Sequence, residues 1–148
     1  MSLSWSDIFL QDPEFDFQRI VTQWSPLVGG TLQPVGLSAF GDFYFLRPDG
    51  TVYVLDVLEG AVRQVADSQA AFGACMNSQE WQEANLMPEV VWQLNRRGLV
   101  RGNGQVFGFA PHPAFVGKIA PETAMVFDAV VWHGICNQSV GPNAKREA

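Results

Sequence analysis

The sequence predicts an α+β fold in which an antiparallel meander sheet is flanked by helices. Residues 31–66 alternate apolar side chains with a period of two, as strands do, and stretches on both sides of them repeat apolar side chains at helical spacing. The chain has 148 residues, the size of one ordinary domain, and 47% of them are hydrophobic. We therefore expect a single domain over residues 1–148, with its core over residues 13–140.

The first expected helix runs from Pro13 to Trp24. Apolar side chains recur at Phe17, Ile20, Val21 and Trp24, which is the spacing of one buried helical stripe. A proline at the first helical position and acidic side chains in the first turn both suit a helix N-terminus. A further proline and a pair of glycines follow and are expected to end this helix.

The alternating segment is expected to form a series of antiparallel strands. The turn sequence Arg47–Gly50 joins two of them as a hairpin, because proline presets φ and glycine accepts a positive φ. A second reversal at Leu58–Gly60 leads into a strand over Ala61–Ala66. The strand Asp42–Leu46 is apolar on both faces, so we expect it at the centre of the sheet.

Two capped helical segments are expected after the sheet. Asp67 or Ser68 is placed to cap a helix that carries Phe72, and Ser78 is placed to cap a short helical turn that carries Trp81. Both caps supply side-chain oxygens for the free backbone N–H groups of a first turn.

The clearest helix signals of the sequence lie between Pro88 and Gly98, with proline at the start, arginines in the last turn and glycine just beyond. A further strand is expected over Gln105–Ala110. Residues 125–137 fit either a continuous helix or a strand followed by a helix, and we favour the continuous helix. The tail, residues 141–148, is expected to fray.

The net charge of −6 restricts the partners that we expect. A negative protein repels nucleic acid and anionic membrane surfaces, and no apolar run approaches the ~20 residues that a membrane-spanning helix needs. The N-terminus also lacks the pattern of a secretion signal. We expect a cytoplasmic protein with no nucleic-acid or membrane partner, either a monomer or a weak homodimer.

The sequence offers few groups for catalysis or metal binding. His112 and His133 belong to no metal-binding motif, and Cys75 and Cys136 lie too far apart for a CxxC site, so we predict no catalytic residue, metal or cofactor. Cys136 follows His133 by three residues, a spacing that on a helix would let the imidazole activate the thiol. The alternative function is therefore a small enzyme or ligand-binding domain with a cleft near His112 and His133.

Acidic and aromatic side chains are the candidates for contact with a protein partner. Tryptophan contributes strongly to protein interfaces, and Trp5, Trp81 and Trp132 are the tryptophans without a clear place on a core stripe. The predicted partner-binding residues are Glu59, Asp67, Glu80, Trp81, Glu83, Glu122 and Trp132.

Glycine, aromatic and turn patterns along most of the chain resemble a bacterial family of domains of unknown function. The segments that carry the resemblance are Ser38–Phe45, Asp49–Asp56, Glu59–Gly60, Gly104–Phe109, His112–Pro113 and Val131–Gln138. That family includes the C-terminal domain of the Tdi-type immunity proteins of type VI secretion, and it is similar to the SUKH immunity superfamily. Lys118 departs from the pattern, because many members have a glycine there.

The resemblance implies an α+β domain that binds and neutralises a cognate protein toxin, often a nuclease. It transfers no functional residue, since its motifs contain no shared contact side chain. The expected function is therefore non-enzymatic: an immunity protein that occludes a secreted bacterial toxin.

Overall fold

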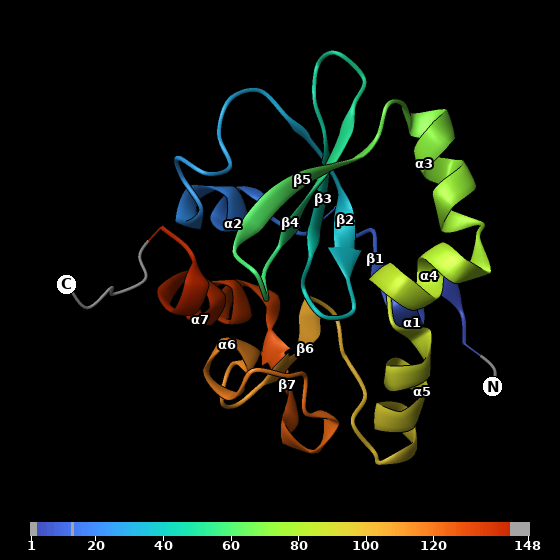
Figure 1. The fold of residues 1–148 in the computed structure, drawn as a ribbon, viewed down its shortest axis with the longest axis vertical. Helices are drawn as coiled ribbons and strands as arrows, with labels where there is room; N and C mark the ends of the chain where they lie inside the picture. Colours follow the sequence, from blue (N-terminus) through green and yellow to red (C-terminus); the bar gives the residue numbers. More distant parts are fainter. Residues whose placement is uncertain (1–2, 13, 143–148) are drawn as a thin grey trace.

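The computed structural model of the chain describes residues 3–12 and 14–142, and these form two sheets with helices around them (Figure 1). The helices are α1 (Trp5–Ile8), α2 (Gln18–Gln23), α3 (Gln69–Met76), α4 (Gln79–Asn85), α5 (Pro88–Arg96), α6 (Pro113–Val116), the 3-10 helix η1 (Pro121–Thr123) and α7 (Ala129–Val140). The strands are β1 (Phe9–Leu10), β2 (Gln33–Ser38), β3 (Phe43–Leu46), β4 (Val52–Asp56), β5 (Ala61–Ala66), β6 (Gln105–Phe109) and β7 (Ala124–Asp128). The prediction of one compact α+β domain is confirmed.

The larger sheet is the predicted antiparallel meander, with strand order β1-β2-β3-β4-β5. The central position expected for Asp42–Leu46 is confirmed, since β3 lies in the middle and Phe43, Tyr44 and Phe45 are all buried. The predicted hairpin is also present: the Arg47 N–H donates to the Thr51 carbonyl at 2.9 Å. The two-residue strand β1 extends this sheet beside β2 and was not predicted.

The smaller sheet corrects the prediction for residues 125–137. The first part of that segment is β7, which pairs antiparallel with β6, and the helix α7 starts only at Ala129. The helix starts at Ala129 because Asp128 caps it: the Asp128 carboxylate accepts the N–H groups of Val130 (2.9 Å) and Val131 (3.1 Å).

None of the helices in the described parts of the chain combines the length and the apolar character that a membrane span requires.

The first predicted helix is shorter than expected. Helix α2 begins at Gln18, and Pro13, the expected start, lies outside the described residues. Two turns closed by aspartate side chains stand where the first helical turns were expected. The Asp12 carboxylate accepts the Glu14 N–H at 2.9 Å, and the Asp16 carboxylate accepts the Gln18 N–H at 3.1 Å. The predicted fraying of residues 141–148 falls mostly on residues 143–148, which are also outside the described ones.

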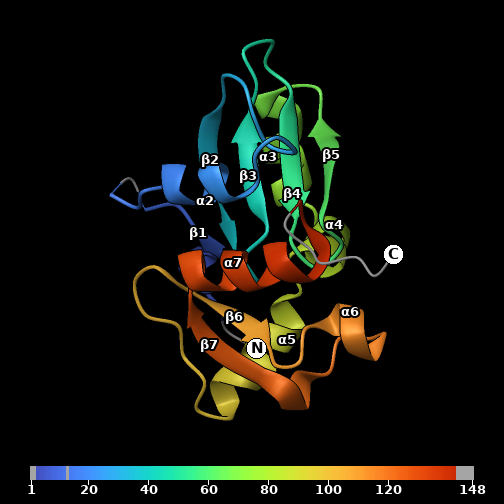
Figure 2. The same ribbon diagram turned by 90° about the vertical axis from the view of Figure 1, so that its left-hand side faces the viewer.

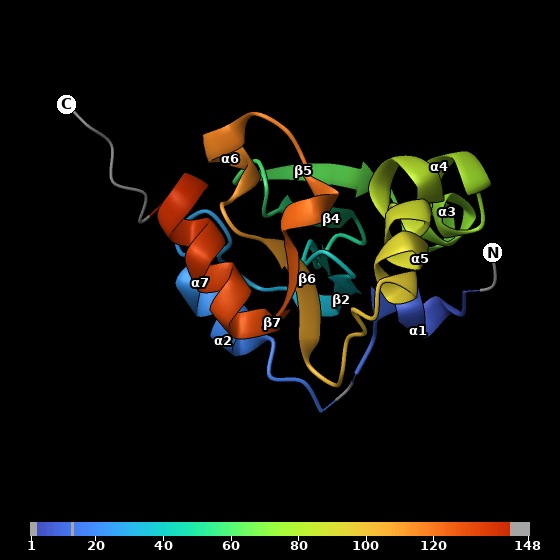
Figure 3. The same ribbon diagram turned by 90° about the horizontal axis from the view of Figure 1, so that it is seen from below.

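The first two helices after the meander confirm the predicted serine caps. Ser68 accepts the Ala71 N–H at 3.0 Å to start α3, and Ser78 accepts the Trp81 N–H at 3.3 Å to start α4. Helix α5 begins at Pro88 as predicted. Figure 3 shows α3, α4 and α5 together with α1 on one side of the strands, and α2 and α7 on the other.

Helix α7 crosses the boundary between the two sheets and joins them (Figure 2). Its Trp132 indole N–H donates to the Phe40 carbonyl at 3.0 Å, in the turn between β2 and β3. The Phe107 N–H of β6 donates to Ala39 of the same turn at 2.7 Å. The two sheets therefore share one core, which α7 closes.

Candidate functional site

Helix α1 presents Trp5 and is held at both ends. The Ser4 N–H donates to Oδ2 of Asp7 at 2.8 Å, which closes the first turn. At the other end Nη2 of Arg101 donates to the carbonyl oxygens of Ser6 (2.8 Å) and Asp7 (2.6 Å). Burial lowers the pKa of Arg101, with the Asp7 charge opposing that shift. Because hydrogen bonds fix both ends of this short helix, the position of Trp5 is defined.

The Trp5 side chain separates two hollows in the surface. Trp5 is 47% exposed, whereas the other four tryptophans are buried or half-buried. One hollow of about 410 Å³ lies between α1 and α4, and another of about 300 Å³ lies between α1, β1 and the end of α3. We define the Trp5 surface as six residues that line the hollows, together with Glu80, which is exposed on α4 three residues before Glu83. The six are Leu3, Trp5, Met76, Gln79, Gln82 and Glu83.

The Trp5 surface has an acidic border on α4. Glu80 and Glu83 are exposed and three residues apart, so they share one face of the helix. Gln79 Nε2 donates to Glu83 Oε1 at 3.1 Å, which orients that carboxylate at the edge of the larger hollow. The side chains that line the two hollows include no lysine or arginine. An exposed aromatic ring beside uncompensated carboxylates is suited to a basic protein surface.

The two predicted partner-binding tryptophans are buried to different degrees. Trp132 is fully buried, so the prediction that it contacts a partner is wrong. The buried face of α7 is wider than the single stripe expected from the sequence, and it includes Trp132 beside Ala129 and His133. Trp81 is half-buried, with its ring 5.9 Å from Phe72 and 6.2 Å from Tyr44. Trp81 therefore packs α4 onto Phe72 and Tyr44, and only part of the Trp81 side chain is accessible to a partner.

The predicted acidic contacts are all exposed, but they do not form one cluster. Glu80 and Glu83 belong to the Trp5 surface. Glu59 lies in the turn between β4 and β5 at the end of α7, Asp67 follows β5, and Glu122 lies in η1. Figure 3 shows α7 and α4 on opposite sides of the strands, so one flat partner surface does not reach all five.

His133 has a structural position in the core. Its Nδ1 accepts the indole N–H of Trp24 at 2.9 Å, so the proton is on Nε2, which donates to the Gly41 carbonyl at 2.6 Å. Burial lowers the pKa of His133 to about 4, with the Gly41 contact opposing that shift. The imidazole is therefore neutral and satisfied at neutral pH, and it ties α2 to the turn before β3.

His112 and Cys136 are likewise interior groups. His112 is 3% exposed, stacks on Trp132 at 5.6 Å and accepts the Ala114 N–H on Nδ1 at 3.0 Å. Burial lowers its pKa, opposed by the Val57 backbone, although Nε2 has no partner in hydrogen-bonding geometry among the described residues. Burial raises the pKa of Cys136, which is the reverse of the activation by His133 that their spacing suggested.

A second group of charged side chains lies where β3, β4 and β5 meet. Arg63 Nη1 lies 2.9 Å from Asp56 Oδ2, and Asp42 Oδ1 accepts the Val57 N–H at 3.1 Å. Burial, and then repulsion from Asp56, raises the pKa of Asp42 to about 7, against the hydrogen bond from Val57. A carboxyl group that titrates near neutrality suits proton transfer. These side chains line neither Trp5 hollow, however, and they hold the turn after β4 in place.

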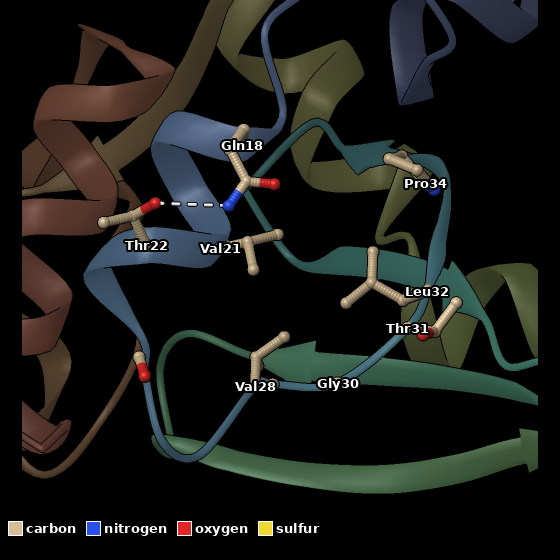
Figure 4. A pocket seen from close by; sticks show the side chains of 10 residues that line it. Gln18, Val21, Thr22, Val28, Gly30, Thr31, Leu32 and Pro34 are labelled. Carbon is tan, nitrogen blue, oxygen red and sulfur yellow. Dashed lines mark hydrogen bonds between the residues drawn. The ribbon is translucent and has the colours of Figure 1, made fainter.

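A further groove lies between α2 and the loop that leads into β2 (Figure 4). Its volume is about 490 Å³, and its walls include Val21 of α2 and Val28 and Leu32 of the loop. Gln18 Nε2 donates to Thr22 Oγ1 at 3.3 Å along its edge. No titratable side chain is among the residues that line this groove, and the nearby Arg47 guanidinium donates to the Gly29 and Thr31 carbonyl oxygens of its wall. For that reason we place the candidate site at the Trp5 surface, which has both an aromatic ring and charge.

Comparison with known proteins supports the fold and leaves the function open. No protein-family profile matches the chain, and no curated protein matches it. A crystal structure of Atu4351 from Agrobacterium tumefaciens is similar, with a TM-score of 0.62 and 18% sequence identity over 91% of this chain and 68% of that chain. At this identity the likeness shows a shared fold: this chain is an α+β protein with the architecture of Atu4351.

Proposed function

We propose that this chain is an immunity protein that binds and occludes a cognate bacterial toxin, and that the Trp5 surface makes the central contact. The observation that carries the proposal is Trp5, which stands exposed between two hollows. Glu83 lines one of them, and Glu80 lies three residues before it on the same face of α4. The resemblance of the turn and glycine motifs to an immunity family points to the same kind of partner.

The physical requirements of occlusion fit this surface. A stable protein interface buries about 800 Å² on each partner and depends on a few aromatic or charged anchors. A toxin that acts on nucleic acid needs a basic substrate face, and the acidic edge of α4 complements such a face. The net charge of −6 would also speed the encounter with it. The proposal places the chain in the cytoplasm, where such a toxin meets its substrate.

Co-expression tests this function. Each protein encoded by a gene adjacent to that of this chain is produced under inducible control as a candidate toxin, and growth is measured with and without the chain. We expect the natural chain to restore growth. Trp5→Ala and the double variant Glu80→Lys/Glu83→Lys should each weaken binding by about tenfold or more, measured by calorimetry. Binding should also weaken as salt is added, because screening removes the charge contribution.

The control is Glu122→Lys, which makes one of the two charge reversals of the double variant at an exposed position away from α4. It should bind the toxin as the natural chain does. Growth that is unaffected by the natural chain would overturn the immunity function. Protection that survives both Trp5-surface variants would retain the function but move the interface elsewhere.

A further inference from the structure

The segment 114–119 exposes an unusual run of apolar side chains. All six of its residues are exposed, and Phe115 (72%), Val116 (44%) and Ile119 (38%) are large hydrophobic groups. Exposed connections normally carry polar residues, and several large apolar side chains gathered at the surface mark an interaction site. This segment lies beside α7, on the other side of the strands from α1 and α4 (Figure 3).

The segment is held in a defined conformation. The buried imidazole of His112 caps α6 by accepting the Ala114 N–H at 3.0 Å, and its ring stacks on Trp132. The Gly117 N–H closes the helix by donating to the Pro113 carbonyl at 2.8 Å, and Gly117 has a positive φ of 77°. Because the loop is anchored to the core through His112, little ordering is needed when a partner binds it.

A hollow of about 300 Å³ is lined by residues that precede and follow the exposed Phe115 in the chain. Its walls come from segment 113–119, the turn between β4 and β5, and the end of α7. We call this region the α6 surface: Leu58, Glu59, Phe115, Lys118, Ile119 and Val140. Its two charged residues have opposite signs, since Lys118 and Glu59 are both exposed and both line the hollow.

The charge pattern selects the partner. Two chains of net charge −6 repel each other, so they approach most easily where the local charge is balanced. A surface with one cation, one anion and a protruding phenyl ring beside a hollow can complement a copy of itself about a two-fold axis. The acidic Trp5 surface does not have this property, because its exposed charges are all negative.

We propose that the α6 surface binds the same surface of a second copy of this chain. In this two-fold dimer Phe115 of each copy enters the hollow of the other, and Lys118 pairs with Glu59 across the axis. The α6 surface has six defining residues, fewer than the about 20–30 residues that each side of a standard interface contributes, so we expect association to depend on concentration. This inference is independent of the proposed toxin binding, since it uses a different face of the molecule.

Sedimentation velocity tests the dimer on the full chain, from low micromolar to millimolar concentration. The natural chain should shift from monomer to dimer across this range. Phe115→Asp should raise the dissociation constant by about tenfold or more, because it places a charge in the hollow of the partner. Val131→Asp, a change at an apolar position of α7 with 54% exposure, is the matched control and should leave association unchanged.

Charge reversal tests the specific pairing. Lys118→Glu and Glu59→Lys should each weaken the dimer, and the double variant should recover it, since the opposite signs are restored across the axis. Unfolding midpoints of all variants are measured in parallel, so that loss of association is separated from loss of folding. A natural chain that stays monomeric at millimolar concentration, or a dimer that persists in Phe115→Asp, would overturn the proposal. Loss of toxin binding in Phe115→Asp, with a monomeric natural chain, would assign this surface to the toxin instead.

Discussion

Trp132 and Trp5 are the same residue type in opposite situations. Trp132 has no exposed surface, donates its indole N–H to Phe40, and stacks with Phe127 at 5.2 Å. Trp5 has 47% of its surface exposed and stands between two hollows. A tryptophan whose ring faces and N–H are all used within the chain stabilises the fold, whereas one with a free face is available to a partner. The comparison separates structural from binding positions, and substitutions test it.

The largest loss of stability is expected at Trp132, the buried tryptophan. Trp132→Ala should lower the free energy of unfolding by about 3–5 kcal/mol, because it leaves a cavity where α7 joins the two sheets. Trp132→Phe keeps most of the volume and loses the hydrogen bond to Phe40, so its loss should be smaller. Urea denaturation measures both. Equal stability of Trp132→Ala and the natural chain would refute the structural role.

Gly41 extends the comparison to the backbone beneath Trp132. Its φ of 97° favours glycine, and an added Cβ would lie 2.8 Å from Cδ1 of Trp132. Gly41→Ala should therefore cost about 3 kcal/mol of unfolding free energy, from strain and overpacking together. Gly50→Ala is the control for strain alone, since Gly50 also has a positive φ (91°) but no atom lies within 4 Å of an added Cβ. Thermal or urea unfolding should show the larger loss at Gly41.

Two buried titratable groups near Trp132 give opposite pH dependences. His133 has a pKa of about 4 when folded and 6.5 as its ordinary value, so its contribution is complete above pH 6.5 and is lost as the pH falls toward 4. Asp42 has a folded pKa of about 7 against an ordinary 3.8, so its contribution is complete below pH 3.8 and is lost as the pH rises toward 7. Between pH 4 and 6.5 the two largely cancel.

Asp42→Asn removes the contribution of Asp42 to the pH dependence of stability and leaves that of His133. The variant should be more stable than the natural chain at pH 7, by about 4 kcal/mol, and equal to it near pH 4. It should also lose stability more steeply on acidification, because the contribution of His133 is then unopposed. Urea titrations at several pH values measure these differences. A variant that is less stable at pH 7 would show that the ionised Asp42 carboxylate supports the fold.

The smallest effect on stability is expected at Trp5. Trp5→Ala should change the free energy of unfolding by about 1 kcal/mol or less, because much of the ring is already in water. Trp81→Ala should cost more, since its ring packs on Phe72 and Tyr44. Urea denaturation compares the two. A loss at Trp5 as large as that at Trp132 would assign Trp5 to the core and remove the basis for the Trp5 surface.

Local patterns predicted the meander and the capped helices well, because period-two alternation, turn glycines and cap residues act within a few positions of each other. The same reasoning misjudged the start of α2 and residues 125–137. In the second case Asp128 is the signal that was available, since it caps α7 through Val130 and Val131. The strand β7 forms because β6 pairs with it, and β6 lies about twenty residues earlier in the chain.

The candidate surfaces were the least predictable part. The acidic residues of α4 were identified from composition, but Gln79, Gln82 and Met76 meet Trp5 only because α1 packs against helices some seventy residues later in the chain. For the same reason the sequence did not reveal that Glu59 and Lys118 line one hollow. Sequence spacing carries no information about such contacts.

By itself, the sequence determined the acidic charge, the size of the core, the meander and the helix caps, since these depend on composition or on neighbours along the chain. Only the tertiary structure decided which tryptophans are buried, which ring nitrogen of His133 carries the proton, and which exposed residues lie together. Burial and proximity are set by packing between distant segments, and it is packing that separates Trp132 in the core from Trp5 at the surface.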